Sequence, residues 1–502
     1  MTSLLAIAPA LLALILAFTT RRVILSLLSS VFLGFLILNN YNPLNAAIAL
    51  YSEGIFQQLE GTNAQVVIVI TIISGFIYLL EASNTMRAFS HLLGTHVTSP
   101  MKLKLSTLFS GIVIFFTDSG NSLILGPVYR PLYDKLKICR EKLAFYIDST
   151  SSPVCVLIPI ISWGAYTMGL MEDSYAAQGI EKDGFAAFME VWFYQLYPLL
   201  TLVSLAFIAI FNVYIGKMRD VQQRYLAGTH TYEDTGSTLQ PMSPALQQHG
   251  TKVVAAALGT LFASMLLLFT YFVIRNGMLD GATIRIALAL SYTMATLTTI
   301  FVLHRLAVFD FSSSSKSFVS GMGRIMPILC ILILAWTLSD VMVQLKTGEA
   351  IALMLDSVNF PSWMLASVIF VIGAGLSLAT GSSWGTFAVI IPIVVTTAFA
   401  LDAPVAVCLG AALSGGLFGD HTSPISDTTV LSSMASGVNH ISHVETQFPY
   451  AMITATLSFV GFMLASLLAQ GSSAMPYVPV LIMAGMAGIA YFLLSRSRLA
   501  VL

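Results

Sequence analysis

Two short segments place carboxylates and helix-breaking residues inside runs of apolar sequence. The first runs from Asp148 to Pro153 (DSTSSP), and the second runs from Asp420 to Pro424 (DHTSP) and continues through Asp427. An ionisable side chain at bilayer depth is costly and by default marks an ion or substrate pathway. Unwinding a helix at Ser-Pro frees backbone carbonyl groups, which join carboxylate and hydroxyl oxygens in the all-oxygen coordination that hard cations prefer. Both segments therefore predict a site for a cation such as Na⁺.

A second kind of polar interruption precedes each of these segments. Thr117 to Ser122 (TDSGNS) precedes the first, and Thr380 to Thr386 (TGSSWGT) precedes the second. We interpret both as tips of helical hairpins, where helix N-termini can face an anionic group of a substrate. A duplicated pair of Pro- or Gly-interrupted segments predicts the midplane binding site of a transporter.

The candidate binding residues are Asp, Ser, Thr, Asn and Trp residues in or next to these four segments. Trp163, which follows the first break, is added to them. A carboxylate here binds a cation or carries a proton, and competition between the two is the physical basis of exchange. We predict Na⁺ at Asp420, Asp427 and Asp148. The full set of candidate cation- or substrate-binding residues is Asp420, Thr422, Ser423, Asp427, Thr428, Ser382, Ser383, Thr386, Asp148, Ser149, Ser151, Ser152, Asp118, Ser119, Asn121, Trp163 and Trp384.

The carboxylates also have structural alternatives. Asp420 and Asp427 could cap the broken helix or pair with a neighbour such as His421. Asp148 is close enough to the inner face to extend towards the surface, and Asp118 could cap the helix that returns from the first tip.

Other polar or aromatic residues favour structural roles. Glu81 and Asp340 end the third spans of the two halves, where an interfacial position is expected. Trp163 is expected to pack against other side chains. His440 and His443 follow the second break in an inner loop, where a solvated position is favoured over pH sensing.

The composition is that of a polytopic membrane protein. Of the 502 residues, 57% are hydrophobic and only 9% are charged, whereas a soluble domain has about a quarter charged residues. The net charge of −1 gives no reason to expect nucleic-acid binding. The apolar N-terminal stretch has no basic residue ahead of it, so we interpret it as a first transmembrane helix rather than a signal peptide.

The hydropathy pattern predicts about eleven membrane-spanning helices. Two further apolar stretches, 105–133 and 363–400, are treated separately because of the charges around them. The predicted spans are residues 4–18, 23–38, 65–80, 143–168, 191–215, 253–274, 284–303, 325–343, 405–434, 450–468 and 478–494.

The orientation follows from Lys and Arg, which concentrate in cytoplasmic loops. Both flanks of residues 105–133 are basic, so this stretch should enter and leave on the inner face as a re-entrant hairpin. Residues 363–400 should do the same on the outer face. The non-helical turn of a re-entrant hairpin is tolerated inside the bilayer only where protein or a water-filled cavity surrounds it. The loop 275–285 is predicted outside despite its two arginines, and the C-terminus is predicted to be cytoplasmic.

The resulting fold class is an all-α polytopic membrane protein with an inverted-topology repeat, two re-entrant hairpins and two broken helices. An odd number of spans in the first half inserts the second half upside down. The first repeat is predicted at 1–216, with its hairpin at 105–133 and its broken helix at 143–169, and a cytoplasmic central loop follows at 217–252. The second repeat is predicted at 253–470, with its hairpin at 363–400 and its broken helix at 405–434. An extra C-terminal helix is predicted at 471–502.

Several motifs resemble the NhaC-type Na⁺/H⁺ antiporter family of the ion-transporter superfamily. The resemblance implies inverted repeats in which two hairpins meet two broken helices. It also implies Na⁺ as coupling ion, no cofactor, and a homodimer with an elevator-like motion. The motifs are 381–387 (GSSWGTF), 416–429 (GLFGDHTSPISDTT), 447–450 (QFPY), 147–156 (IDSTSSPVCV) and 162–166 (SWGAY), and the resemblance covers about 65–468.

We therefore predict a secondary active transporter coupled to Na⁺, with Na⁺/H⁺ antiport across the inner (plasma) membrane first. The alternative is Na⁺-coupled transport of an amino acid or small carboxylate, because the family is functionally mixed and the hydroxyl groups of Ser149 to Ser152 could build a solute pocket. The partners are Na⁺, H⁺ or a small organic solute, and the lipid bilayer. An enzyme is disfavoured because no HExxH, nucleophile elbow or Gly-rich phosphate loop accompanies the aspartates. A channel would need a continuous polar pore.

Overall fold

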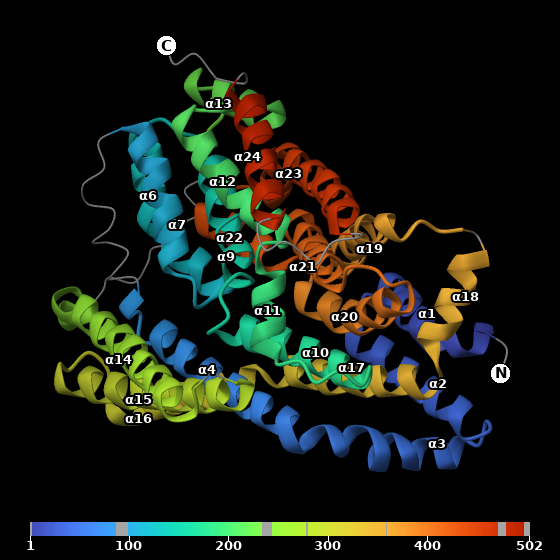
Figure 1. Cartoon of the computed structure of the whole chain (residues 1–502). Coiled ribbons are helices and arrows are strands. Elements are labelled where there is room, and N and C mark those ends of the chain that lie inside the picture. Colours follow the sequence, from blue (N-terminus) through green and yellow to red (C-terminus); the bar gives the residue numbers. More distant parts are fainter. Residues whose placement is uncertain are drawn as a thin grey trace.

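The computed structural model describes residues 3–86, 99–232, 243–277, 280–357, 359–469 and 478–495. These residues fold into helices and short connections, and no strand occurs among them (Figure 1). The predicted all-α class is therefore confirmed for the part of the chain that the structure describes.

The first helices precede the first hairpin. α1 (Ser3–Thr20) packs against α2 (Val23–Leu38), and α4 is Gly61–Ala82. Between them, the Asn42 side chain accepts hydrogen bonds from the first amides of α3 (Pro43–Ala49), which is a standard helix start. The chain then continues through a π-helical turn (Leu50–Ile55) and a 3₁₀ turn (Gln57–Leu59).

The first hairpin consists of α6 (Pro100–Val113) and α7 (Asp118–Lys135). Its turn covers residues 114–117, so the predicted tip at 118–122 lies instead in the first turn of α7. The reason is local: the Thr117 hydroxyl accepts a hydrogen bond from the Gly120 amide, and an acidic residue at the first position suits the positive end of the helix.

The first broken segment is interrupted twice rather than once. It comprises α8 (Arg140–Asp148), α9 (Ser152–Cys155) and α10 (Ser162–Ala177). Proline at the second position of α9 is compatible with a helix start. The helices that follow are α11 (Gly184–Trp192), α12 (Leu196–Ile210), α13 (Gly216–Leu226), α14 (Pro244–Asn276) and α15 (Gly281–Arg305), so the predicted central loop contains α13 and the start of α14.

The predicted inner loop after α15 is mostly helical. α16 (Phe311–Arg324) joins α17 (Met326–Gln344) almost without a gap, and the two form one helical stretch of 34 residues that contains an apolar span. Ser312 to Ser315 lower the hydropathy of this segment, so the hydropathy pattern does not predict a helix here. The Asp310 side chain nevertheless caps the start of α16 by accepting a hydrogen bond from the Ser313 amide.

Four helices and a 3₁₀ turn cover the region of the predicted second hairpin and second broken segment. α18 (Thr347–Ser357) and a 3₁₀ turn (Ser362–Met364) lead into α19 (Leu365–Thr380) and α20 (Ser383–Ala400), which turn at Gly381 and Ser382. The broken segment consists of α21 (Val405–Thr422) and α22 (Asp427–Ser436), and the last helices are α23 (His440–Ala469) and α24 (Val478–Ser495).

The described helices make this an integral, multi-pass membrane protein. Seven helical stretches in the described ranges are long and apolar enough to cross a membrane, or up to nine if each of two bent pairs counts as one span. Two shorter apolar helices, Leu5–Thr20 and Val480–Leu493, fall below that length. The number eleven therefore stays a prediction.

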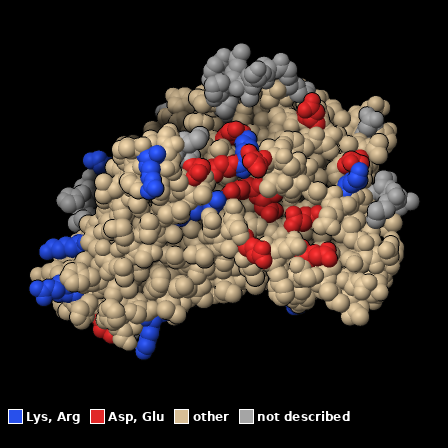
Figure 2. Space-filling view, turned by 60° about the horizontal axis from the view of Figure 1, so that its bottom comes forward, with Lys and Arg blue, Asp and Glu red and all other residues tan. Residues whose placement is uncertain are grey.

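Segments predicted on the same side of the membrane contact one another. On the predicted inner side, the Lys217 ammonium lies 2.6 Å from Glu445. On the predicted outer side, Arg285 forms two hydrogen bonds with Glu172, at 3.1 and 2.8 Å. This pairing gives Arg285 a counter-charge within the protein. Figure 2 shows acidic side chains gathered in the middle of one face, while most of the visible Lys and Arg lie towards its left end.

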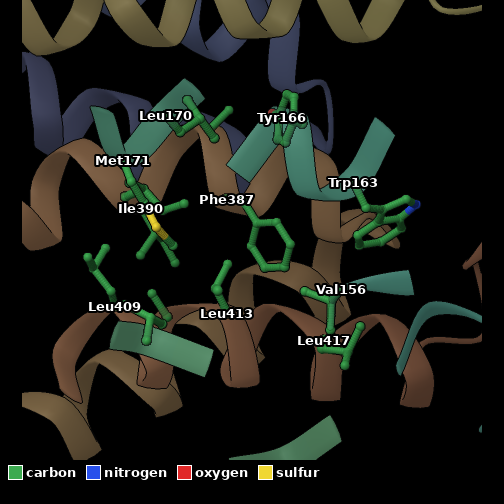
Figure 3. Close-up of a cluster of buried hydrophobic side chains, with 14 of the residues drawn as sticks. Val156, Trp163, Tyr166, Leu170, Met171, Phe387, Ile390, Leu409, Leu413 and Leu417 are labelled. Carbon is green, nitrogen blue, oxygen red and sulfur yellow. The ribbon is translucent and has the colours of Figure 1, made fainter. Parts of the chain in front are cut away.

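An apolar core joins α10 to the second hairpin and the second broken segment. Figure 3 shows these side chains meeting between the helices, with α10 on one side and α21 on the other. The packing fixes the walls of the site described below. The labelled side chains are Val156 after α9, Trp163, Tyr166, Leu170 and Met171 of α10, Phe387 and Ile390 of α20, and Leu409, Leu413 and Leu417 of α21.

Candidate functional site

One cavity of about 470 Å³ brings together both hairpin tips and the second break. The first tip contributes Thr117, Asp118 and Ser119. The second tip and the second break contribute Ser382, Ser383, Trp384, Asp420 and Asp427, and Trp163 comes from the start of α10. The cavity is lined by Ser74, Ile77, Glu81, Phe116, Thr117, Asp118, Ser119, Ser162, Trp163, Arg324, Ile325, Ile328, Gly381, Ser382, Ser383, Trp384, Asp420, Ile425 and Asp427.

Asp420 is the most enclosed carboxylate of this cavity. It lies in the last turn of α21 and is 3% exposed. Its Oδ2 accepts a hydrogen bond of 2.8 Å from the Ser383 hydroxyl at the second tip. Its Oδ1 is buried and has no hydrogen-bond partner among the described residues. A buried carboxylate oxygen without a donor is costly, so this atom indicates a place for a cation or a proton.

The second tip and the second break are held together through backbone. The Ser423 hydroxyl donates to the Leu378 carbonyl at 2.8 Å. Gly381 has a φ of 67°, and a Cβ there would lie 2.8 Å from the Ile425 carbonyl oxygen. A Cβ on Gly419 would lie only 2.3 Å from the Ala374 carbonyl oxygen. These close approaches require glycine and fix Asp420 beside the tip.

Asp427 is the exposed carboxylate of the same break. It is the first residue of α22, it faces the cavity, and its Oδ1 accepts a 2.9 Å hydrogen bond from the Thr428 amide. The hydroxyl groups of the predicted threonines are used locally. Thr422 donates to Phe418, Thr386 donates to Ser382, and the Thr428 hydroxyl lies 3.0 Å from that of Ser426.

The first tip is polar and faces the same cavity. Asp118 Oδ1 accepts from the Ser119 amide at 2.6 Å, so part of this carboxylate is engaged at the start of α7. Glu81 lies close by and accepts a 2.6 Å hydrogen bond from the Thr117 hydroxyl. We predicted Glu81 at the membrane interface; the structure places it in the cavity lining. Asp340, its counterpart, is outside this lining and accepts from Gln58 at 2.6 Å.

Asp148, the carboxylate of the first break, does not line the cavity. It is 1% exposed, and its Oδ2 accepts hydrogen bonds from Gln447 at 2.7 Å and from Thr429 at 3.2 Å. The Nε2 atom of His443 lies 3.3 Å from the same oxygen. His443 is fully buried in α23, so the predicted solvated position is wrong. The Oδ1 atom of Asp148 has no partner among the described residues.

The remaining polar groups of the first break bind other parts of the protein. The Ser149 hydroxyl lies 2.9 Å from His421 Nε2, and the Tyr197 hydroxyl lies 2.7 Å from His421 Nδ1. His421 therefore pairs with these groups rather than with Asp420. Ser151 donates to the Asp118 carbonyl, Asn121 donates to the Thr150 carbonyl, and the buried Ser152 hydroxyl has no partner among the described residues.

The two predicted tryptophans meet at the cavity wall. The rings of Trp163 and Trp384 have centroids 4.6 Å apart and are tilted by 53°. The Tyr166 hydroxyl donates to the Trp384 carbonyl at 2.7 Å, which ties α10 to the second tip. Trp163 thus packs against another side chain, as expected, and also lines the cavity.

Sequence reasoning missed three functional-site neighbours, Arg324, His443 and Gln447. Arg324 lines the cavity, and its guanidinium carbon lies 3.9 Å from the centre of the Tyr78 ring. Arg324 lies between the predicted spans 284–303 and 325–343, and its sequence neighbours gave no signal that separates it from an ordinary basic loop residue. Gln447 opens the QFPY motif, yet nothing in one sequence shows that its side chain reaches Asp148.

Comparison with known proteins identifies the family of the chain. Residues 154–467 match the model of the Na⁺/H⁺ antiporter family. The chain belongs to that family. It is accordingly a transporter, and the predicted resemblance to the NhaC-type family is confirmed.

Known proteins match either most of the chain or parts of it. An uncharacterized protein of Haemophilus influenzae is 31% identical over 496 residues, which cover 94% of this chain and 92% of that protein. The malate-2H(+)/Na(+)-lactate antiporter of Bacillus subtilis is 39% identical over 114 residues, 22% of this chain and 24% of that protein. The crystal structure of the Alcanivorax borkumensis YdaH transporter shares the fold, with a TM-score of 0.57, 13% identity, and coverage of 84% of this chain and 85% of that chain.

Proposed function

We propose that this antiporter-family protein exchanges Na⁺ for H⁺, with Na⁺ bound at the second break. The observation that carries the proposal is the buried, unpartnered Oδ1 of Asp420 beside the cavity. Asp427 supplies a second carboxylate on the same lining. The described residues hold no cluster of three or more His, Cys, Asp or Glu side chains suited to a metal ion, so hydroxyl and backbone carbonyl oxygens would complete the coordination, as Na⁺ allows.

The exchange follows from competition for one carboxylate. In a buried site an ionised carboxylate is stable only with a compensating positive charge. Either Na⁺ or a proton provides that charge, and neither can bind while the other occupies Asp420. Ser383 would serve both states, because its hydroxyl group contacts Asp420 at 2.8 Å without carrying charge.

We also retain as proposals the finer features of the predicted architecture. They are about eleven spans, two re-entrant hairpins in inverted repeats, a homodimer with an elevator-like motion, and an inner-membrane location with a cytoplasmic C-terminus. A further Na⁺ at Asp148 also stays a prediction. Only its Oδ1 is open to a cation, since Oδ2 already has three neighbours, Gln447, Thr429 and His443.

The proposal is tested in reconstituted vesicles that contain a pH dye. An imposed Na⁺ gradient should drive a pH change in wild type, and Asp427→Asn should abolish it. Asp402→Asn is the matched control, because Asp402 is an exposed carboxylate in the turn before α21, outside the cavity lining. A wild-type protein that gives no pH response to Na⁺ would exclude antiport.

A second function is Na⁺-coupled transport of an amino acid or small carboxylate. The observation that favours it is the cavity volume of about 470 Å³, which falls within the range of small-molecule sites, about 300–1,000 Å³, and exceeds what one ion needs. Na⁺-dependent uptake of a labelled solute without a pH response would place this function first.

A further inference from the structure

Arg324 is an unusual residue for the wall of a membrane cavity. It is the last residue of α16, just before the apolar helix α17 begins at Met326, and its side chain is exposed. An arginine on the wall of a cavity in a membrane protein marks a place for a partner or a ligand. The proposed Na⁺/H⁺ exchange gives this charge no role.

The guanidinium group is positioned by an aromatic ring and interacts electrostatically with Glu81. It stacks on the Tyr78 ring at 3.9 Å, and Nη2 donates to the Tyr78 hydroxyl at 3.2 Å. Within the described ranges, no carboxylate lies at ion-pair distance from Arg324. Guanidinium has five N–H donors in a fixed fork, so most of them remain available to a ligand in the cavity. The Tyr78 stack holds the fork in place, which lowers the entropy cost of binding.

The rest of the lining is acidic. Four carboxylates, those of Glu81, Asp118, Asp420 and Asp427, share the cavity with the single arginine. A dicarboxylate would find one positive group and several negative ones. A simple amine would leave the arginine without a counter-ion. A solute that carries both an ammonium and a carboxylate group complements both the acidic side chains and the arginine of the lining.

We propose that the cavity binds a small amino acid, whose carboxylate pairs with Arg324 and whose ammonium group lies among the carboxylates. Planar, bidentate pairing with carboxylate is the interaction that arginine provides best. The faces of Trp163 and Trp384 offer an apolar or cation–π contact to the remainder of the solute. This inference rests on the cation site of the proposed function, because Na⁺ at Asp420 and Asp427 removes negative charge that would otherwise repel the solute carboxylate.

The test is thermal unfolding of the purified, full-length protein with Na⁺ and a panel of solutes. Ligands that bind only the folded state raise the unfolding temperature. The panel contains the common amino acids. For each one that binds, it also contains the amine without the carboxylate and the acid without the amino group. At saturating Na⁺, we expect at least one amino acid to stabilise the protein and both of its truncated analogues to fail at the same concentration.

Variants of Arg324 separate recognition from folding. Arg324→Gln should weaken the amino-acid response by about 10-fold or more, because the solute carboxylate loses a charge-assisted, bidentate partner. Arg324→Lys should retain part of it. Arg305→Gln, which changes an arginine in the last turn of α15 outside the cavity lining, should behave as wild type. The shift caused by Na⁺ alone should persist in all three variants, which shows that they fold and keep the cation site.

Three results would overturn the inference. They are stabilisation by Na⁺ but by no amino acid, equal stabilisation by the acid that lacks the amino group, and an unchanged amino-acid affinity in Arg324→Gln. In each of these results a normal Na⁺ shift would leave the proposed cation site intact. Loss of the Na⁺ shift in wild type would instead remove the proposed function itself.

Discussion

The two chain breaks have similar sequences but different surroundings. At the first break, Asp148 is enclosed by donors from α22 and α23, and the carboxylate is outside the cavity lining. At the second break, Asp420 accepts a hydrogen bond from Ser383, and both Asp420 and Asp427 line the cavity. The same Asp-to-Ser-Pro pattern can therefore place a carboxylate either among hydrogen-bond donors from other helices or on the wall of a cavity. The difference depends on what packs against it.

Both breaks also contact their own hairpin. The first is joined to its tip by Ser151 and Asn121, whose side chains donate to backbone carbonyls. The second is joined by Ser423 and by glycines that allow direct backbone contact, such as Gly419. The contact between the first break and its hairpin thus depends on side-chain hydrogen bonds. The contact between the second break and its hairpin depends on glycines, which let the two backbones approach closely. We call these two contacts the first and the second joint.

The largest expected effect concerns Asp420. Asp420→Asn removes the charge that compensates a bound cation in a buried site, and losing one partner of a buried charge pair costs about 3–5 kcal/mol. We expect the apparent Na⁺ affinity to fall by at least about 100-fold, measured as uptake of radioactive Na⁺ into vesicles. Wild-type affinity in this variant would remove Asp420 from the cation site.

The next effect should appear in stability rather than in transport. Gln447→Leu leaves Asp148 without its shortest hydrogen bond, and a buried acceptor that loses its donor costs about 1–3 kcal/mol, more when it is charged. We expect a lower unfolding temperature with the Na⁺ response retained. Gln223→Leu, on the exposed face of α13, is the control. A stable Gln447→Leu protein that has lost its Na⁺ response would reverse the roles assigned to the two breaks.

A third effect compares the two joints. Gly419→Ala places a Cβ 2.3 Å from a backbone oxygen, whereas Gly111→Ala meets the Thr150 side chain, at 2.1 Å from Oγ1. Backbone cannot move aside as a side chain can, so Gly419→Ala should lose about 1–3 kcal/mol and Gly111→Ala should lose less. Equal unfolding temperatures for the two variants would argue against the stiffer second joint.

The smallest effect tests how α10 is tied to the second tip. Tyr166→Phe removes only the hydrogen bond to the Trp384 carbonyl, which should cost about 1 kcal/mol. We expect a small fall in unfolding temperature and a change in tryptophan fluorescence, because Trp384 and Trp163 are in contact. An unchanged spectrum would show that the Trp163–Trp384 packing alone holds the tip.

The sequence predicted many of the helices and turns, because apolar runs and helix-breaking residues determine the local backbone structure. The turn at Gly381 and the break after Asp420 were placed within a few residues. α16 was missed because its serine-rich start carries no hydropathy signal, although Asp310 caps a helix there. The second interruption before α10 was missed because the residues around Pro159 are apolar and give the same signal as a continuous span.

The site was predicted in part, and the failures have one physical cause. Residues on the breaks and tips were found because their own sequence marks them. Glu81, Arg324, His443 and Gln447 lie on other helices, and only tertiary packing decides whether their side chains reach the cavity or Asp148. Whether Asp148 would meet donors or a cavity was likewise undetermined by its neighbours along the chain.

The most direct test of the account is a Na⁺ titration followed by thermal unfolding in three proteins: wild type, Asp148→Asn and Asp427→Asn. Na⁺ should raise the unfolding temperature of wild type and of Asp148→Asn over the same concentration range, since binding to the folded state stabilises it. Asp427→Asn should show no Na⁺-dependent rise. A full rise in Asp427→Asn together with its loss in Asp148→Asn would place the principal cation site at the first break and contradict the account.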